Sequence, residues 1–154
     1  MAYWLLKSEP DEFSLADLFA QNRRRSCWDG VRNYQARNML RDDFRKGDQA
    51  FFYHSNCAEP GIVGIVDVVR EAYPDDTAFD PANPHFDPKS DQENPRWFMV
   101  DVRYKRKLKR TITLKELRNY ADSSLSDMLL LRTGNRLSVM PVIEENWNFI
   151  LGLE

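Results

Sequence analysis

A dense run of prolines between Tyr73 and Pro95 is the feature that most constrains this fold. Five of the eight prolines in the chain lie in this stretch, at positions 74, 81, 84, 88 and 95. Proline lacks a backbone N–H and fixes φ, so prolines at this density exclude a helix or a central strand. Long irregular loops are uncommon inside compact domains and often act as lids or binding loops. We therefore expect a loop over about residues 73–95, either functional or an inert insertion between two strands.

Short periodic segments on both sides of this loop predict strands mixed with helices. Apolar, aromatic or alternating residues indicate strands at Tyr3–Lys7, Gln49–His54, Ile62–Val69, Phe98–Tyr104 and Leu137–Met140. Capping-box patterns or apolar stripes indicate helices after Ser14 and Thr113 and over Asn33–Phe44, Ser124–Arg132 and Ile143–Leu151. Because strands and helices do not alternate regularly, we expect an α+β fold: a small mixed barrel of five or six strands with helices packed outside.

The length of 154 residues predicts a single domain, because domains usually contain about 100–200 residues. No apolar run approaches the ~18–20 residues that span a bilayer. We recognise no signal peptide, and so expect a cytoplasmic protein with no membrane partner. The only cysteines, Cys27 and Cys57, are expected to be free, buried thiols. Together with two histidines 31 positions apart, they offer no zinc-site spacing, so we expect neither metal nor cofactor.

The charges are unevenly distributed along the chain. Residues 71–93 contain seven acidic residues and one lysine, a local net charge of −6, which leaves +4 for the rest because the total is −2. Basic residues cluster at Arg23–Arg25, along Arg32–Arg45 and from Arg103 to Arg110. This clustering allows a basic face for nucleic acid, but an ordinary solvated surface explains it equally well.

Two of the four tryptophans lie outside apolar patterns. Trp4 and Trp147 belong to apolar segments and are expected in the core, whereas Trp28 and Trp97 lie on connecting segments beside arginines. Large aromatic side chains in such places can stack on a nucleobase, a contact that contributes about 1–3 kcal/mol per base. A core position is the alternative for both.

Several blocks of the sequence resemble the EVE domain family, in the order in which the family carries them. They are Tyr3–Ser14 (YWLLKSEPDEFS), Trp28–Asn38 (WDGVRNYQARN), Phe52–Ser55 (FYHS), Pro60–Gly64 (PGIVG), Pro95–Trp97 (PRW) and Arg136–Pro141 (RLSVMP). The resemblance covers nearly the whole chain. It implies a PUA-like barrel related to the YTH domains, and a reader of modified nucleobases in DNA or RNA, with modified cytosine in DNA as the commonest proposal.

The resemblance also implies where the base binds. Lys7, Ser8 and Trp28 match positions that YTH readers use at the end of the first strand and in the aromatic cage. The full set of base-pocket candidates is Lys7, Ser8, Trp28, Val31, Asn33, Tyr34, His54, Ser55 and Trp97. An aromatic wall holds an alkylated base by dispersion and water exclusion, while hydroxyl, amide and imidazole groups read its polar edge. Structural alternatives remain: Ser8 turning the chain, Asn33 capping a helix and His54 lying in the core.

Phosphate contacts must help to offset the few kcal/mol that flipping a base out of a duplex costs. Arg32, Arg37 and Arg41 lie near the candidate pocket in sequence and are the first candidates. The tract Arg103–Arg110 is the second, with plain solubilising charge as its alternative.

Two other functions remain open. A hydrolase acting on a modified nucleoside or RNA, as proposed for some ASCH-type PUA-like proteins, could use Lys7, Ser8 and Glu9, provided that the strand ends there. His54 and Cys57 could form a thiol–imidazole pair, but no third orienting group accompanies them. A protein-interaction module is the remaining alternative.

Overall fold

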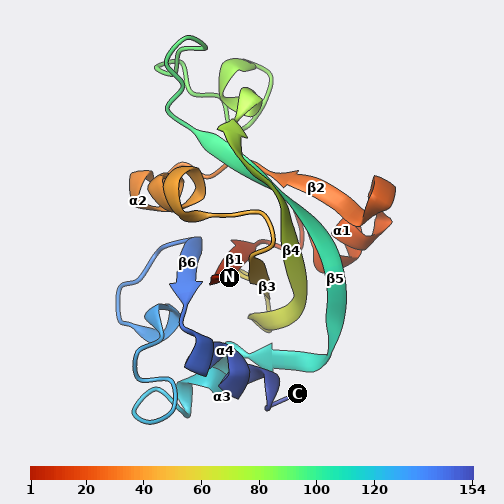
Figure 1. Cartoon of the computed structure of the whole chain (residues 1–154), viewed down its shortest axis with the longest axis vertical. Helices are drawn as coiled ribbons and strands as arrows, with labels where there is room; N and C mark the ends of the chain where they lie inside the picture. The colour runs from red at the N-terminus through yellow and green to blue at the C-terminus, as the bar shows by residue number, and fades with distance from the viewer.

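The computed structural model describes residues 1–154 and contains one six-stranded sheet with short helices around it (Figure 1). The strands follow the order β2-β5-β4-β3-β1-β6 across the sheet. Their bounds are β1 Tyr3–Ser8, β2 Arg25–Trp28, β3 Gln49–His54, β4 Gly61–Pro74, β5 Phe98–Thr113 and β6 Val139–Val142.

The sheet is mixed, because β1 and β3 pair in parallel while every other pair is antiparallel. The expected α+β class with six strands and surrounding helices is therefore confirmed. The expected closed barrel is wrong: β2 and β6 are the two edges, and no ladder joins them. Both edge strands contain four residues, and β6 includes Pro141, which an edge strand tolerates.

The helices are α1 Leu15–Ala20, α2 Tyr34–Asn38, α3 Leu114–Arg118 and α4 Glu144–Leu151. Shorter turns are η1 Asn22–Arg24, η2 Met39–Asp43, η3 Asp76–Phe79 and η4 Leu129–Leu131. The capping box at Ser14 is confirmed, since its hydroxyl accepts from the Asp17 N–H and the Asp17 carboxylate accepts from the Ser14 N–H. None of the helices combines the length and the apolar character that a membrane span requires.

Alternating strand residues build one apolar cluster on each face of the sheet. Trp4, Leu6 and Phe52 belong to a cluster with Trp28 that α1 and α2 cover. Leu5, Phe51 and Tyr53 belong to the other, which α3 and α4 cover with Leu117 and Trp147 among its members. This alternation decides where the side chains at the end of β1 point, because Ser8 shares parity with Leu6, and Lys7 with Leu5.

Three local predictions were wrong or incomplete. The expected helix over Ser124–Arg132 is a series of turns ending in η4, although Leu125 and Met128 are buried as the pattern indicated. Strand β2 was not predicted. The cysteines are free, but Cys27 is exposed and Cys57 half-buried, so they are not core thiols.

The proline-rich segment forms a protruding loop between β4 and β5, at the top of Figure 1. Tyr73 and Pro74 still belong to β4, η3 follows, and turns lead to β5. The loop prediction is confirmed for the remainder of the segment. One part of the loop returns to the body of the protein, because the His85 backbone carbonyl accepts from Arg32.

Candidate functional site

A cavity of about 690 Å³ opens where β1 and β2 end. Its volume falls within the ~300–1,000 Å³ of typical small-molecule sites. Five of the nine predicted pocket residues line it: Lys7, Ser8, Trp28, Val31 and Ser55. Segments far apart in the sequence therefore meet here: the two strand ends, the connection after β3 and the proline-rich loop.

Trp28 is the larger of the two aromatic residues that line the cavity, the other being Phe13. It is the last residue of β2 and is 7% exposed, so most of the indole packs in the core and the remainder borders the cavity. Phe52 meets it edge-to-face, with ring centroids 5.4 Å apart and planes at 89°. This contact fixes the orientation of the indole without covering all of it.

At the end of β1, the side chains of Lys7 and Ser8 have different partners. The Ser8 hydroxyl donates to the Phe13 carbonyl at 2.6 Å, and the Ser8 carbonyl accepts from the Ser55 N–H at 3.0 Å. The Lys7 ammonium lies 5.8 Å from the centroid of the Tyr53 ring, and burial lowers the pKa of Lys7. The hydroxyl and the amine thus have separate partners, which is not the convergent arrangement that the hydrolase interpretation requires.

Gly30 and His85 form one rim of the cavity. Gly30 has φ +78°, a conformation that favours glycine, and its N–H donates to the Asp75 carboxylate at 2.8 Å. A Cβ at this position would lie 2.7 Å from the His85 imidazole. Glycine therefore lets the proline-rich loop pack directly against the segment after Trp28.

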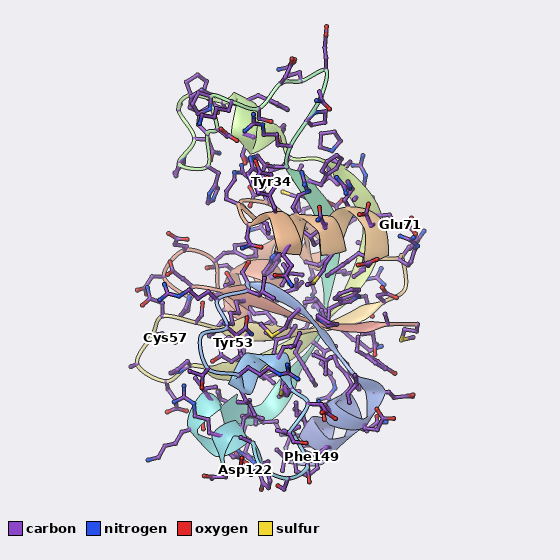
Figure 2. The ribbon with its side chains drawn as sticks, turned by 90° about the vertical axis from the view of Figure 1, so that its left-hand side faces the viewer. Tyr34, Tyr53, Cys57, Glu71, Asp122 and Phe149 are labelled. Atoms are coloured by element: carbon purple, nitrogen blue, oxygen red, sulfur yellow. The ribbon has the colours of Figure 1, made fainter.

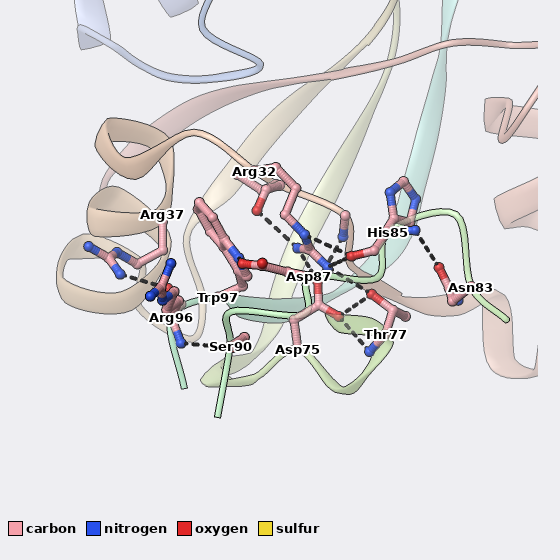
Figure 3. Close-up of polar contacts among 12 residues, drawn as sticks. Arg32, Arg37, Asp75, Thr77, Asn83, His85, Asp87, Ser90, Arg96 and Trp97 are labelled. Carbon is pink, nitrogen blue, oxygen red and sulfur yellow. Dashed lines mark hydrogen bonds and ion pairs between the residues drawn. The ribbon is translucent and has the colours of Figure 1, made fainter. Parts of the chain in front are cut away.

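Arg32 anchors that loop, as Figure 3 shows. Its guanidinium donates to the Asp75 carboxylate at 3.0 Å, to the Thr77 hydroxyl at 3.1 Å and twice to the His85 carbonyl, at 2.8 and 3.1 Å. Burial alone would raise the pKa of Asp75, but hydrogen bonds from Thr77, Gly30 and Arg32 outweigh burial and leave it below the ordinary value. Arg32, a predicted phosphate contact, is thus engaged within the protein.

Two ionisable groups next to Trp28 have raised pKa values. Burial and the negative charges of Asp29 and Asp101 raise the pKa of the Cys27 thiol to about 11, so this thiol is a poor nucleophile at neutral pH. Burial and the nearby Asp75 raise the pKa of Asp29, with His85 acting in the opposite direction.

Four predicted pocket residues do not line this cavity. Asn33 caps α2 by accepting from the Ala36 N–H at 2.9 Å. His54 accepts from the Leu15 N–H at 3.1 Å, and burial lowers its pKa. Trp97 donates to Asp87 at 2.7 Å and stacks on Tyr34, with centroids 4.9 Å apart. Tyr34, the first residue of α2, is 52% exposed (Figure 2).

The remaining predicted phosphate contacts lie outside the cavity. Arg37 lies 4.9 Å from the Tyr34 ring centroid and donates to the Arg96 carbonyl. Arg41 pairs with its neighbour Asp42. The tract Arg103–Arg110 lies on β5 and is largely paired, through Asp67, Glu116 and Glu154.

The sequence analysis did not nominate several polar residues that line the cavity: Glu12, Asp29, His85, Arg136 and Ser138; it named Glu9, which also lines the cavity, only for the hydrolase alternative. Most of them belong to the blocks that carry the EVE resemblance, and this membership is the signal that could have identified them. His85 belongs to no such block, and only the folded loop brings it to the cavity.

Comparisons with known proteins identify the family to which the chain belongs. The family model described as "EVE domain" matches residues 2–153. The chain belongs to the EVE domain family. Human thymocyte nuclear protein 1 is 49% identical over 99% of this chain and 74% of its own length. An uncharacterized protein of Schizosaccharomyces pombe is 40% identical over 96% of this chain and 66% of its own length.

Solved structures of similar chains include one with a bound nucleic acid. The human THYN1 protein in complex with 5-methylcytosine-containing DNA superimposes with a TM-score of 0.95 and 48% identity, over 99% of this EVE domain and 97% of that chain. A mutant of the ZmASCH protein from Zymomonas mobilis shares the fold alone, with a TM-score of 0.57 and 10% identity over 99% of both chains. The broad α+β fold is therefore shared with a chain of very different sequence.

Proposed function

We propose that this EVE domain is a binding module for a modified cytosine in DNA, held as an extruded base in the cavity beside Trp28. The observation that carries the proposal is the indole at the wall of a cavity of about 690 Å³. The bound DNA of the human relative, which carries 5-methylcytosine, supports the choice of base. Lys7, Ser8, Val31 and Ser55 complete the proposed base site.

The chemistry of the wall suits a base with an added alkyl group. A methyl group on the pyrimidine is apolar and gains dispersion contacts when it leaves water for an aromatic surface. Phe52 holds the indole from behind, so the wall is rigid before the base arrives. A preorganised wall avoids the ordering cost that a mobile side chain would add to binding.

The DNA backbone on either side of the base also needs contacts with the protein. Flipping a base out of a duplex costs a few kcal/mol, and cationic side chains on flanking phosphates help to offset it. We propose Arg37 and Arg41 for this role, because Arg41 is exposed and Arg37 half-buried on the helical segment that follows Trp28, and neither is paired with a buried carboxylate. Arg32 is left out, since its guanidinium anchors the loop.

The test is a binding titration with fluorescently labelled DNA that contains either one 5-methylcytosine or one cytosine. The native protein should prefer the methylated strand. Trp28→Ala should weaken binding of that strand by about 5- to 150-fold, the equivalent of 1–3 kcal/mol of stacking, while Trp28→Phe should keep part of the affinity. The same titration with RNA strands that contain either one 5-methylcytosine or one cytosine measures the preference between DNA and RNA.

The matched control is Phe19→Ala, because Phe19 is an exposed aromatic side chain on α1 that does not line the cavity. It should leave the preference for methylated DNA unchanged. A native protein that binds both strands equally, or a folded Trp28→Ala variant that keeps its preference, would contradict the proposal.

A further inference from the structure

An aromatic wall alone cannot identify methylated cytosine in DNA. Thymine carries the same methyl group at the same ring position, so dispersion contacts to that methyl group do not separate the two bases. The bases differ at position 4, where cytosine has an amino group that donates and thymine has a carbonyl oxygen that accepts. A selective site therefore needs a hydrogen-bond acceptor that faces position 4.

Several acceptors in and around the cavity already have partners in the protein. The Glu9 carboxylate accepts from the Asn56 side chain at 2.7 Å, and the Ser8 hydroxyl donates to Phe13. Asp75 accepts from Gly30, Thr77 and Arg32. Asp101, which lies opposite Cys27 on β5, accepts from Arg25 and Tyr73.

Asp29 and Glu12 are the two cavity carboxylates to which no other residue donates a hydrogen bond and which form no ion pair, and of the two only Asp29 is next to Trp28 in the chain. The strand β2 and the Gly30–Asp75 hydrogen bond fix the backbone on either side of Asp29. A base resting against the indole would therefore have this carboxylate close to its edge.

We propose that Asp29 is the specificity residue of the site, accepting a hydrogen bond from the 4-amino group and so selecting cytosine-type over thymine-type bases. The inference rests on the proposed function and adds the basis of discrimination between two methylated pyrimidines. A thymine carbonyl would face a carboxylate, and two acceptors without a proton between them repel each other.

The surroundings of Asp29 favour such a ligand. Burial and the charge of Asp75 raise the pKa of Asp29, while His85, the backbone of Asp29 itself and Arg32 act in the opposite direction and favour the ionised carboxylate. An amino donor from the base would add a hydrogen bond to a charged acceptor, which is roughly twice as strong as a bond between neutral groups.

The experiment compares Asp29→Asn with the matched control Glu12→Gln, which also replaces a carboxylate lining the cavity by its amide. Each protein is titrated with single-stranded DNA of one sequence that carries 5-methylcytosine, cytosine or thymine at the central position. Single strands remove the flipping cost, so the affinities report the site itself. The native protein should bind 5-methylcytosine more tightly than thymine by about tenfold or more, as for a good base-edge contact.

Asp29→Asn should bring the affinities for 5-methylcytosine and thymine within about threefold of each other, because an amide can rotate to donate or accept. Its preference for 5-methylcytosine over cytosine should persist, since the indole reads the methyl group. Glu12→Gln should behave like the native protein. The unfolding midpoint of each variant in urea establishes that it is folded.

The two proposals fail in different ways. If the native protein does not prefer 5-methylcytosine over cytosine, the proposed function fails. If it has that preference and Asp29→Asn still rejects thymine as the native protein does, the role of Asp29 is overturned and the proposed function stands. Equal loss of discrimination in Glu12→Gln would also overturn the assignment to Asp29.

Discussion

Replacing Arg32 by alanine tests whether this side chain anchors the proline-rich loop or serves a bound phosphate. The native guanidinium donates five hydrogen bonds, to Val31, Asp75, Thr77 and His85. The Asp75 side chain is fully buried, and that of Arg32 is 22% exposed. Arg32→Ala leaves the buried carboxylate with hydrogen bonds but without its counter-charge.

The expected cost is substantial even in the absence of DNA. Removing one partner of a buried ion pair costs about 3–5 kcal/mol. Asp75 keeps its bonds to Gly30 and Thr77, so we expect the lower end, about 3 kcal/mol of unfolding free energy. A phosphate contact on the surface would instead change stability by no more than about 0.5 kcal/mol.

The pH dependence gives a second signature. The pKa of Asp75 lies below its ordinary value in the folded protein, so its ionised form stabilises the fold. That contribution is complete above the unfolded pKa of about 3.9 and is lost as the pH falls through the lower folded pKa. Without Arg32 the pKa of Asp75 rises, and less stability should be lost between about pH 5 and pH 2.

Urea unfolding followed by tryptophan fluorescence, at neutral and acidic pH, measures both effects. Arg37→Ala is the control, because it removes a half-buried arginine that donates to the Arg96 carbonyl near the same loop but pairs with no buried carboxylate. If Arg32→Ala changes the unfolding free energy by less than about 0.5 kcal/mol, as surface substitutions do, Arg32 does not anchor the loop.

Two further predictions concern the segment beside Trp28. Gly30→Ala should lower the unfolding free energy by about 1–2 kcal/mol more than Gly134→Ala. Both glycines have φ +78°, but only at Gly30 would an added Cβ press against His85. Equal losses in the two variants would contradict this packing. In a Cys57→Ser background, alkylation of Cys27 should accelerate about tenfold per pH unit from pH 8 to pH 10, since its pKa is about 11 and only the thiolate reacts. Mass spectrometry of the modified peptide measures that rate, and a plateau above pH 9 would refute the raised pKa.

Local signals in the sequence predicted much of the fold. The capping box at Ser14 depends on contacts within four residues. The apolar and aromatic residues that indicate β1 and β3 lie within each strand. The extent of β4 and β5 was underestimated because the added part of each strand is held by the predicted part of the other: Arg70–Pro74 pairs with Phe98–Asp101, and Arg106–Ile112 pairs with Ile62–Ile65. Strand β2 exists only because it pairs with β5, more than 70 residues further along the chain.

The site was predictable to the extent that it lies at strand ends. Ser8 and Trp28 come to one cavity because they end β1 and β2. His54 was a plausible pocket residue on spacing, but its imidazole accepts from the first turn of α1, a partner 39 residues away that the sequence did not indicate. The role of Arg32 depends in the same way on Asp75 and His85, which are brought close only when the proline-rich loop folds back.

Under the proposed function, the distribution of charge favours selectivity that arises from the base over selectivity that arises from the phosphates. Several arginines are paired with carboxylates within the chain, as in the pairs Arg25–Asp101, Arg32–Asp75 and Arg106–Glu154. Around the cavity the unpaired cations are Lys7 and Arg136, and the carboxylates of Glu9, Glu12 and Asp29 exceed them by one charge. Coulombic attraction to a polyanion is therefore weak at the mouth of the cavity, and it would in any case act on every sequence alike. Under the two proposals, discrimination between one base and another would come from contacts inside the cavity, with the Trp28 indole against the apolar substituent and the Asp29 carboxylate facing the amino group.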